Sequence, residues 1–378
     1  MENIDLAGIP VVDNHCHGIR PEGAGTDPLA FRRAFTEAAD PGMPSEHVAT
    51  TTFYRRLLRS LARFLECEPD EEAILAVRAA LEPQELAGKL LRDANVEVLL
   101  LDTGFPPPDQ VLSPCELAGL GDLRTETMPR LEILMQRLIT GHDSPGEVEE
   151  ALRGELRDVR SSGHVALKSI AAYRTGLEIR RWPAEETEAS FREAKREIEG
   201  GGRLQHKPIL DTLLHVAFAE AARQEVPVQF HVGYGDADTD LRLGNPLHLR
   251  GVFEEPGLRG MPVVLLHECY PFTREGGYLA AVYENAYLDL SYAIPLLGYG
   301  EMLAFTRGAL GVAPTSKLLY SSDGTGAPEL HWMGAHDGRR VLGEALGEAV
   351  SHGEMSAGEA EDVGEAILRG NSNRLYGL

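Results

Sequence analysis

Short apolar runs alternate with longer amphipathic stretches along most of this chain. The clearest apolar runs lie at residues 96–104, 165–173, 226–232, 262–267, 286–291 and 317–322. Between them, segments such as 184–199 and 208–224 carry apolar residues at helical spacing. Continuous apolar runs are typical of strands in a parallel sheet that is covered on both faces. Together with a run that starts at Val11 and a weaker one at 127–134, they predict eight strands.

Eight strands in alternation with helices are what a (β/α)8 TIM barrel of the α/β class requires. The pattern changes after the first strand, where a Gly- and Pro-rich stretch to about residue 42 predicts a long loop, and helices are predicted at 52–66, 69–81 and 83–94. We therefore expect one domain over residues 1–378 with a helical insertion at about 20–92. Its apolar stripe is interpreted as packing on the barrel, and the alternative is a lid or dimer surface beside the active site.

Composition narrows the classes of partner. The chain has 36 basic and 59 acidic residues, a net charge of −23, which repels nucleic acid and anionic membranes. Its four cysteines form no CxxC pair, and its acidic start shows neither a signal peptide nor an apolar run long enough for a membrane span. We expect a cytoplasmic protein that acts on a small molecule, and a homo-oligomer is left open.

Residues of metal-ligand type fall at the ends of several predicted strands. They are His15 and His17 on the first, Lys168 within the fourth, His231 on the fifth, His267 on the sixth and Asp323 on the eighth. Taken singly, each histidine or aspartate has an ordinary structural explanation, such as a core histidine or a turn residue. A buried lysine must pair, lose its proton or be modified to a carbamate. Because barrel enzymes build their sites at this rim, and Zn²⁺ prefers imidazole and carboxylate ligands, the group predicts a metal site.

This order of ligands resembles the amidohydrolase superfamily of metal-dependent barrels. Segments 168–177, 231–236 and 371–376 are similar to the amidohydrolase domain that is fused to a glutamine-synthetase-like domain in nodulin-like proteins. The resemblance implies a divalent metal, with Zn²⁺ expected and one or two ions, held by His15, His17, His231 and Asp323. Asp323 would also take the proton of the metal-activated water. His267 would ligate a second ion or steady the substrate carbonyl, and a carbamylated Lys168 would bridge two ions in binuclear relatives.

The predicted activity is that of a metal-dependent hydrolase that cleaves a C–N bond, amide or γ-glutamyl in type, of a small carboxylated substrate. A metal-dependent non-oxidative decarboxylase or a sugar-acid isomerase on the same scaffold is the alternative, and a non-enzymatic binding protein is the third hypothesis. Arg174, Arg242 and Arg274 lie just beyond predicted strand ends. Each could pair with a nearby acid on the surface, but together they are expected to bind the substrate carboxylate.

Overall fold

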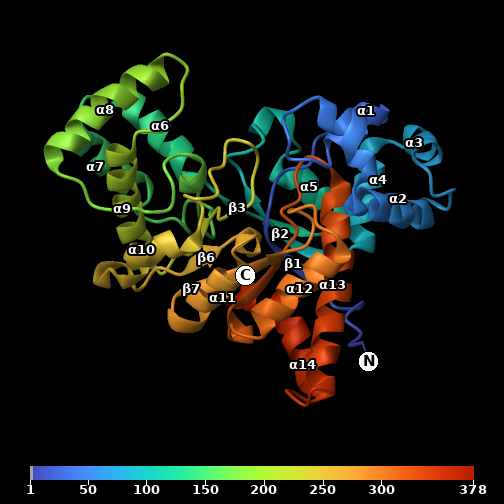
Figure 1. Cartoon of the computed structure of the whole chain (residues 1–378). Coiled ribbons are helices and arrows are strands. Elements are labelled where there is room, and N and C mark those ends of the chain that lie inside the picture. Colours follow the sequence, from blue (N-terminus) through green and yellow to red (C-terminus); the bar gives the residue numbers. More distant parts are fainter. Residues whose placement is uncertain (1–2) are drawn as a thin grey trace.

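A computed structural model describes residues 3–378 and confirms the (β/α)8 arrangement (Figure 1). The eight parallel strands are β1 (Val11–Cys16), β2 (Val96–Asp102), β3 (Arg124–Met128), β4 (Leu167–Ser169), β5 (Val228–Phe230), β6 (Val263–Leu265), β7 (Ala286–Ser291) and β8 (Leu318–Ser321). They pair in chain order as a three-stranded sheet, β1-β2-β3, and a five-stranded sheet, β4-β5-β6-β7-β8.

Backbone contacts join the two sheets at both seams. Between β3 and β4, a parallel bridge pairs Arg130 with Lys168. Between β8 and β1, the backbone N–H of Asp323 donates to the carbonyl of His15 at 3.1 Å. The strand ends therefore lie around one rim, and the end of β8 sits directly beside the end of β1.

In the part of the chain that the structure describes, fifteen α-helices lie between the strands or after the last of them. They are α1 (Pro28–Arg33), α2 (Thr52–Leu65), α3 (Glu71–Ala79), α4 (Pro83–Asp93), α5 (Pro114–Gly121), α6 (Leu131–Gly141), α7 (Pro145–Glu155), α8 (Ala184–Glu199), α9 (Lys207–Gln224), α10 (Arg250–Glu254), α11 (Thr273–Val282), α12 (Tyr299–Leu310), α13 (Pro328–Ser351), α14 (Ala357–Glu365) and α15 (Asn371–Tyr376). Over residues 3–378, no helix is both long enough and apolar enough for a bilayer span.

Two predicted elements were wrong in position. The third strand was expected at 127–134, but β3 ends at Met128 and the helix α6 begins at Leu131. The sequence of β3, Arg-Thr-Glu-Thr-Met, is mostly polar and half-exposed, so it lacks the apolar run that reveals the other strands. The stretch expected to be a loop contains the short helix α1, whose N-terminus is capped by the Asp27 carboxylate.

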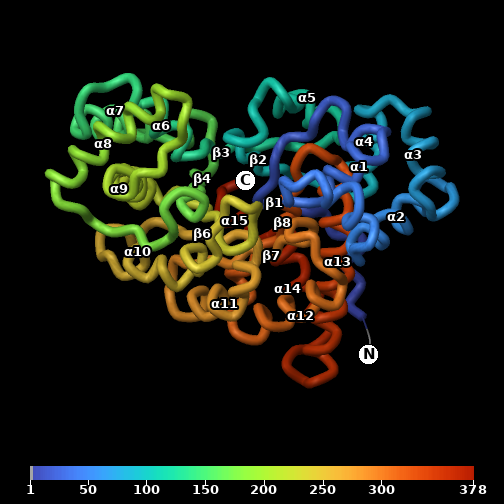
Figure 2. Tube along the Cα trace, turned by 45° about the horizontal axis from the view of Figure 1, so that its top comes forward, coloured from blue at the N-terminus to red at the C-terminus, as the bar shows by residue number. Residues whose placement is uncertain are grey.

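Two groups of helices flank the rim of the barrel. Helices α1–α4 lie between β1 and β2 in the chain, and α6–α9 lie on either side of β4. Figures 1 and 2 place these groups on opposite sides of the strand ends, the first in blue and the second in green. We call them the insertion lobe (α1–α4) and the green lobe (α6–α9). Because they face each other across the rim, both contribute walls to any site there.

Side chains fill the interior of the barrel at the amino-terminal ends of the strands. Val12, Val98 and Met128 pack in a fully buried cluster together with Tyr376 of α15. The Tyr376 hydroxyl donates to the Asn14 side chain at 3.0 Å. Apolar side chains and the C-terminal helix therefore occupy the amino-terminal half of the barrel, which leaves polar side chains to line the carboxyl-terminal rim.

Candidate active site

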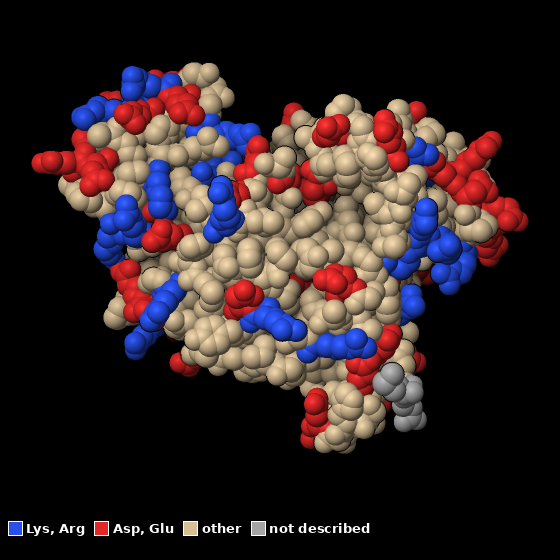
Figure 3. Space-filling view, viewed as in Figure 1, with Lys and Arg blue, Asp and Glu red and all other residues tan. Residues whose placement is uncertain are grey.

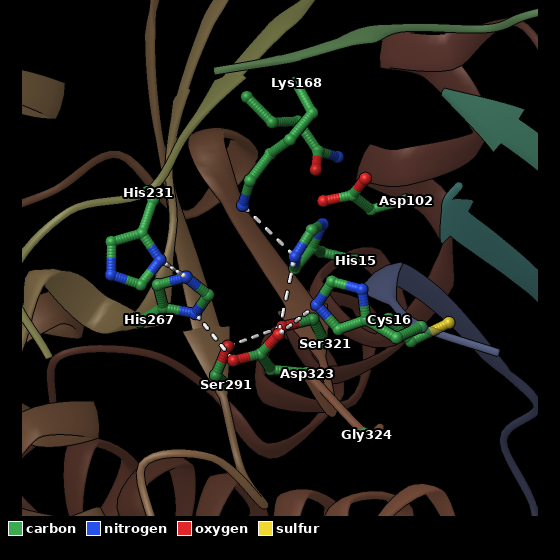
Figure 4. Close-up of polar contacts among 12 residues, drawn as sticks. His15, Cys16, Asp102, Lys168, His231, His267, Ser291, Ser321, Asp323 and Gly324 are labelled. Atoms are coloured by element: carbon green, nitrogen blue, oxygen red, sulfur yellow. Dashed lines mark hydrogen bonds and ion pairs between the residues drawn. The ribbon is translucent and has the colours of Figure 1, made fainter. Parts of the chain in front are cut away.

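Six side chains predicted from the sequence meet at the carboxyl ends of the strands, and Figure 4 labels all of them except His17. All six are buried. They are His15 of β1, His17 just after it, Lys168 of β4, His231 after β5, His267 after β6 and Asp323 after β8. Because five different strands supply them, only the closed fold brings these side chains together.

The Asp323 carboxylate is the centre of this group. The Nε2 atoms of His15 and His17 both lie 3.4 Å from its oxygen Oδ1. The donor atoms of these three residues lie within 4.8 Å of one another. His267 Nδ1 lies 3.1 Å from the other oxygen, Oδ2. Asp323 thus presents one oxygen to the two β1 imidazoles and the other to the β6 imidazole.

A register shift in β1 turns His15 into the barrel. The pairing of β1 with β2 is irregular between Asp13 and Cys16. Asn14 faces the interior, since its amide donates to Asp289 at 2.8 Å, and Cys16 packs in the outer apolar layer. Strict alternation from Asn14 would point His15 outward. The irregularity re-aims it, as β-bulges beside active sites commonly do.

The protonation states of the ligands suit a divalent cation. Burial, with Lys168 nearby, lowers the pKa of His15 to about 3, and burial lowers that of His231 as well. Burial opposes ionisation of Asp323, but the three neighbouring imidazoles hold the pKa of its carboxyl well below the usual range. Metals bind neutral imidazole and ionised carboxylate. Convergence of these donors on one buried point therefore fits a bound divalent ion.

His231 does not contact the group formed by His15, His17 and Asp323 directly, but reaches it through His267. Its Nδ1 is 2.8 Å from His267 Nε2, and its own Nε2 is buried without a hydrogen bond to any residue described. Lys168 Nζ lies 3.2 Å from His15 Nε2. Burial lowers the pKa of this lysine to about 8, against the opposing effect of Asp102. The lysine is therefore close enough to this group to influence it, and a fraction of the lysine is neutral near physiological pH.

Asp102 and Arg130 belong to the site but were missed by sequence reasoning. Asp102 ends β2 and lies beside His15 and Lys168 in Figure 4. Arg130 follows β3, and its Nη2 is 2.6 Å from the Asp102 carboxylate. Both are charged residues at strand ends, which is the signal that identified the histidines. They were missed because the predicted strands, 96–104 and 127–134, extend beyond the observed ends of β2 and β3 and so place both residues inside a strand.

Two buried carboxylates fix the strand ends that carry the ligands. Asp289 of β7 accepts the backbone N–H of His267 at 2.9 Å. Asp13 of β1 accepts the backbone N–H of Ser322 at 2.8 Å and also its hydroxyl. Asp323, the next residue, has a left-handed backbone with φ of 52°. The Asp13–Ser322 contact therefore ties β1 to β8 and holds Asp323 in this costly conformation.

The group opens into a cavity of about 300 Å³. Its walls include Glu37, Tyr173, Arg130, Arg174, Arg203 and Asp236. Of the three arginines expected to bind substrate, only Arg174 lines it. Arg242 is exposed and pairs with Asp240 at 2.7 Å, and Arg274 is exposed at the start of α11. The structure does not bring Arg242 or Arg274 into the site, and the cavity takes Arg130 and Arg203 in their place.

Comparisons with known proteins identify relatives that cover nearly the whole chain. Protein fluG of Emericella nidulans is 28% identical over 406 residues, covering 98% of this chain and 46% of that protein. The chain thus spans about half the length of this curated relative. A structure from Lactobacillus casei, named as a candidate metal-dependent hydrolase, has a TM-score of 0.85 and 28% identity, covering 100% of this chain and 98% of that one.

A uronate isomerase from Thermotoga maritima has a TM-score of 0.63 at 15% identity, covering 98% of this chain and 95% of that one, and this likeness shows the fold alone. The amidohydrolase family model matches residues 179–378, which is more than half of the chain. The matched part includes His231, His267 and Asp323 and continues to the C-terminal helix. The chain belongs to the amidohydrolase family.

Proposed function

We propose that this protein is a metal-dependent hydrolase that cleaves a C–N bond, amide or γ-glutamyl in type, of a small carboxylated substrate. The observation that carries the proposal is the arrangement of Asp323, which has two imidazole Nε2 atoms at one oxygen and His267 at the other, at the base of a cavity. An ionised, oriented carboxylate at the bottom of a pocket is a suitable general base. Arg174 in the cavity wall offers a guanidinium to a substrate carboxylate.

His15, His17 and Asp323 would hold the cation. His231 would be a further ligand, as the resemblance to the amidohydrolase superfamily implies. A divalent cation supplies a Lewis acid that lowers the pKa of water towards about 7. Zinc is our proposed ion. Asp323 then accepts the proton of the attacking water and returns it to the leaving nitrogen, while His267, whose Nδ1 lies 3.1 Å from Oδ2, orients this carboxylate. In a site with two ions, Lys168 would join them as a carbamate.

The same residues would also serve a decarboxylase or a sugar-acid isomerase that uses one cation. Hydrolysis is favoured because the Asp323 carboxylate is held ionised beside the cavity, ready to move a proton between water and a leaving group. The reactions differ in what leaves the substrate. An amide releases an amine, a decarboxylase releases carbon dioxide, and an isomerase releases nothing.

The test combines metal analysis with a substrate screen. The purified protein is analysed by elemental mass spectrometry before and after chelation, with His17→Ala as the ligand variant and His352→Ala, at an exposed position, as its control. We expect bound divalent metal in the wild type and His352→Ala and reduced metal in His17→Ala. Glutaryl and γ-glutamyl amides are then screened for amine release, beside uronates and aromatic carboxylic acids. Absence of metal uptake, or turnover of only the uronates or aromatic acids, would overturn the proposal.

A further inference from the structure

The cavity walls come from two lobes, and the charges on those walls differ in sign. Arg174 and Arg203 lie on the side of the green lobe, and Glu37 lies in the insertion lobe with Asp236 near it. Figure 3 shows the hollow between the lobes, with basic side chains along the inner edge of the green lobe and acidic side chains on the facing side. Asp238 also lines the cavity but pairs with Arg203, so the arginines and carboxylates of this lining that lack an ion-pair partner among the described residues are Arg174 on one side and Glu37 with Asp236 on the other.

On the basic wall, Arg174 is the arginine without a partner. Arg130 pairs with Asp102 at 2.6 Å, and Arg203 pairs with Asp238 at 3.1 Å. Arg174 forms no ion pair within residues 3–378, and its Nε atom is buried without a hydrogen bond. Leaving buried donors unpaired is costly. A ligand anion would supply the missing acceptor.

On the acidic wall, Glu37 is the charged group without a partner in the described part of the chain, as Arg174 is on the basic wall. Its side chain is half-buried, and its carboxylate makes no ion pair or hydrogen bond with the described residues. The charged groups that face it are Asp323, Asp236, His17 and Arg33. Burial, followed by the two aspartates, raises the pKa of Glu37 to about 7, because His17 and Arg33 offset these effects only in part. A ligand cation would add further positive charge.

Glu37 also lines a second hollow of about 300 Å³ that continues from the first. The two hollows share Glu37, Phe105, Asp236 and Thr325 in their walls. A ligand that extends from Arg174 past Asp323 towards Glu37 therefore has room beyond the acidic wall. Together the two hollows offer space for a chain with a group at each end.

We propose that the substrate is dipolar, with a carboxylate that binds Arg174 and a protonated amine that binds Glu37, on either side of the bond that reacts at Asp323. The chemical class is a small amide with a free carboxylate at one end and a free ammonium group at the other. This inference rests on the proposed function for the identity of the reacting bond. It assigns Glu37 as the residue that selects for the cationic end.

The test uses ligands without a scissile bond, so that binding is measured on the intact enzyme independently of its chemistry. The probes are 4-aminobutyrate, 6-aminohexanoate and 8-aminooctanoate, each compared with the alkanoate in which a methyl group replaces the ammonium group. Kd is measured by calorimetry for the wild type, Glu37→Gln, Arg174→Met and Glu46→Gln. Glu46 is an exposed residue of the same insertion lobe outside the cavity and is the matched control.

For the chain length that fits, the preference for the amino acid over its alkanoate should fall about tenfold in Glu37→Gln, as for loss of one charge-assisted contact. Glu46→Gln should keep the wild-type ratio, and Arg174→Met should weaken both members of the pair about equally. The inference is overturned if no probe binds, or if the ratio is unchanged in Glu37→Gln while that variant keeps the wild-type melting temperature. If the enzyme hydrolyses amides but does not prefer the amino acids over the alkanoates, the proposed function stands and this inference fails. If it shows the preference but hydrolyses no amide, the selection of a cationic end by Glu37 stands and the proposed function fails.

Discussion

At the scale of single residues, Asp323 has the most demanding position in the site. Its carboxylate contacts three imidazoles, and its backbone is left-handed with φ of 52°. Asparagine is nearly isosteric and is one of the few residues that tolerate this backbone region. Asp323→Asn therefore removes the charge and the proton acceptor with little change in shape.

We expect Asp323→Asn to lower kcat for amide hydrolysis by about 100-fold or more, the usual contribution of a general acid–base group. The measurement is steady-state amine release at saturating metal, with metal content determined on the same sample. Activity within about threefold of the wild type at equal metal content would mean that another group accepts the proton.

Glu37 gives a pH-dependent prediction for protein freed of metal by a chelator. Its pKa rises to about 7 in the folded state, chiefly because of burial, against a usual value of 4.5. Between these values the folded state binds more protons than the unfolded state, so the contribution of Glu37 to stability falls as pH rises through this window. Glu37→Gln should gain in urea midpoint over the wild type between about pH 5 and about pH 8. An advantage that is constant over this range would contradict the assigned shift.

At the scale of elements, the apolar pattern predicted those strands of the barrel that are buried on both faces. Burial on both faces makes such strands continuously apolar. The strand β7 was found at its predicted bounds, and β8 within one residue or so of them. The half-exposed β3 lacks that signal, and helices α6 and α7 were not identified. The first residues of α6 were assigned to the third strand, because its predicted bounds of 127–134 run past the end of β3 at Met128.

The site was predictable to the extent that it follows strand ends. The histidines and Asp323 lie there, and so do the missed Asp102 and Arg130. Glu37 was out of reach, because it comes from the insertion lobe and no local pattern distinguishes it from the many other acids of the chain. Arg242 was misjudged for a local reason: its partner Asp240 lies two residues away, and that pairing turns it out of the cavity.

Ion pairs join the insertion lobe to α13: Arg56 of α2 pairs with Asp337 at 2.9 Å, and another pair is almost fully buried. Arg78 of α3 contacts Glu329 in the first turn of α13, and their side chains are 4% and 0% exposed. The guanidinium also lies 4.9 Å from the ring centroid of Phe31 in α1. The Glu329 oxygens have no hydrogen bond to other described residues, so Arg78 is the group that compensates this carboxylate.

Arg78→Met should therefore lower the free energy of unfolding by roughly 3 kcal/mol, because it leaves a buried charge without a partner. The double variant Arg78→Met/Glu329→Gln should recover more than half of this loss. Urea unfolding provides the measurement. Lys89→Met, which breaks an exposed pair with Glu85 in α4, is the control and should change the free energy of unfolding much less than Arg78→Met does. Equal losses in Arg78→Met and Lys89→Met would show that the lobe is held mainly by its other contacts with the barrel, among them the pair of Arg56 with Asp337.

At the scale of the whole molecule, the site lies across the seam at which β8 meets β1. His15 and His17 come from one side of this seam and Asp323 from the other, and Asp13 and Ser322 bond across it. β1 and β8 are the first and last strands of the chain. A cation held by His15, His17 and Asp323 would therefore link residues that are far apart in the sequence. Its binding free energy is therefore available only to the folded barrel.

Metal removal should accordingly lower the melting temperature. A ligand present at about 100 times its Kd stabilises the folded state by about 2.7 kcal/mol. With an unfolding entropy of about 2 cal/mol/K per residue, chelation of a chain of 378 residues should lower Tm by about 3 °C, measured by calorimetry. His17→Ala should melt near the chelated wild type and respond little to chelator. His352→Ala, at the exposed C-cap of α13, should respond as the wild type does. A wild-type Tm unaffected by chelation, equal to that of His17→Ala, would mean that no cation bridges the seam.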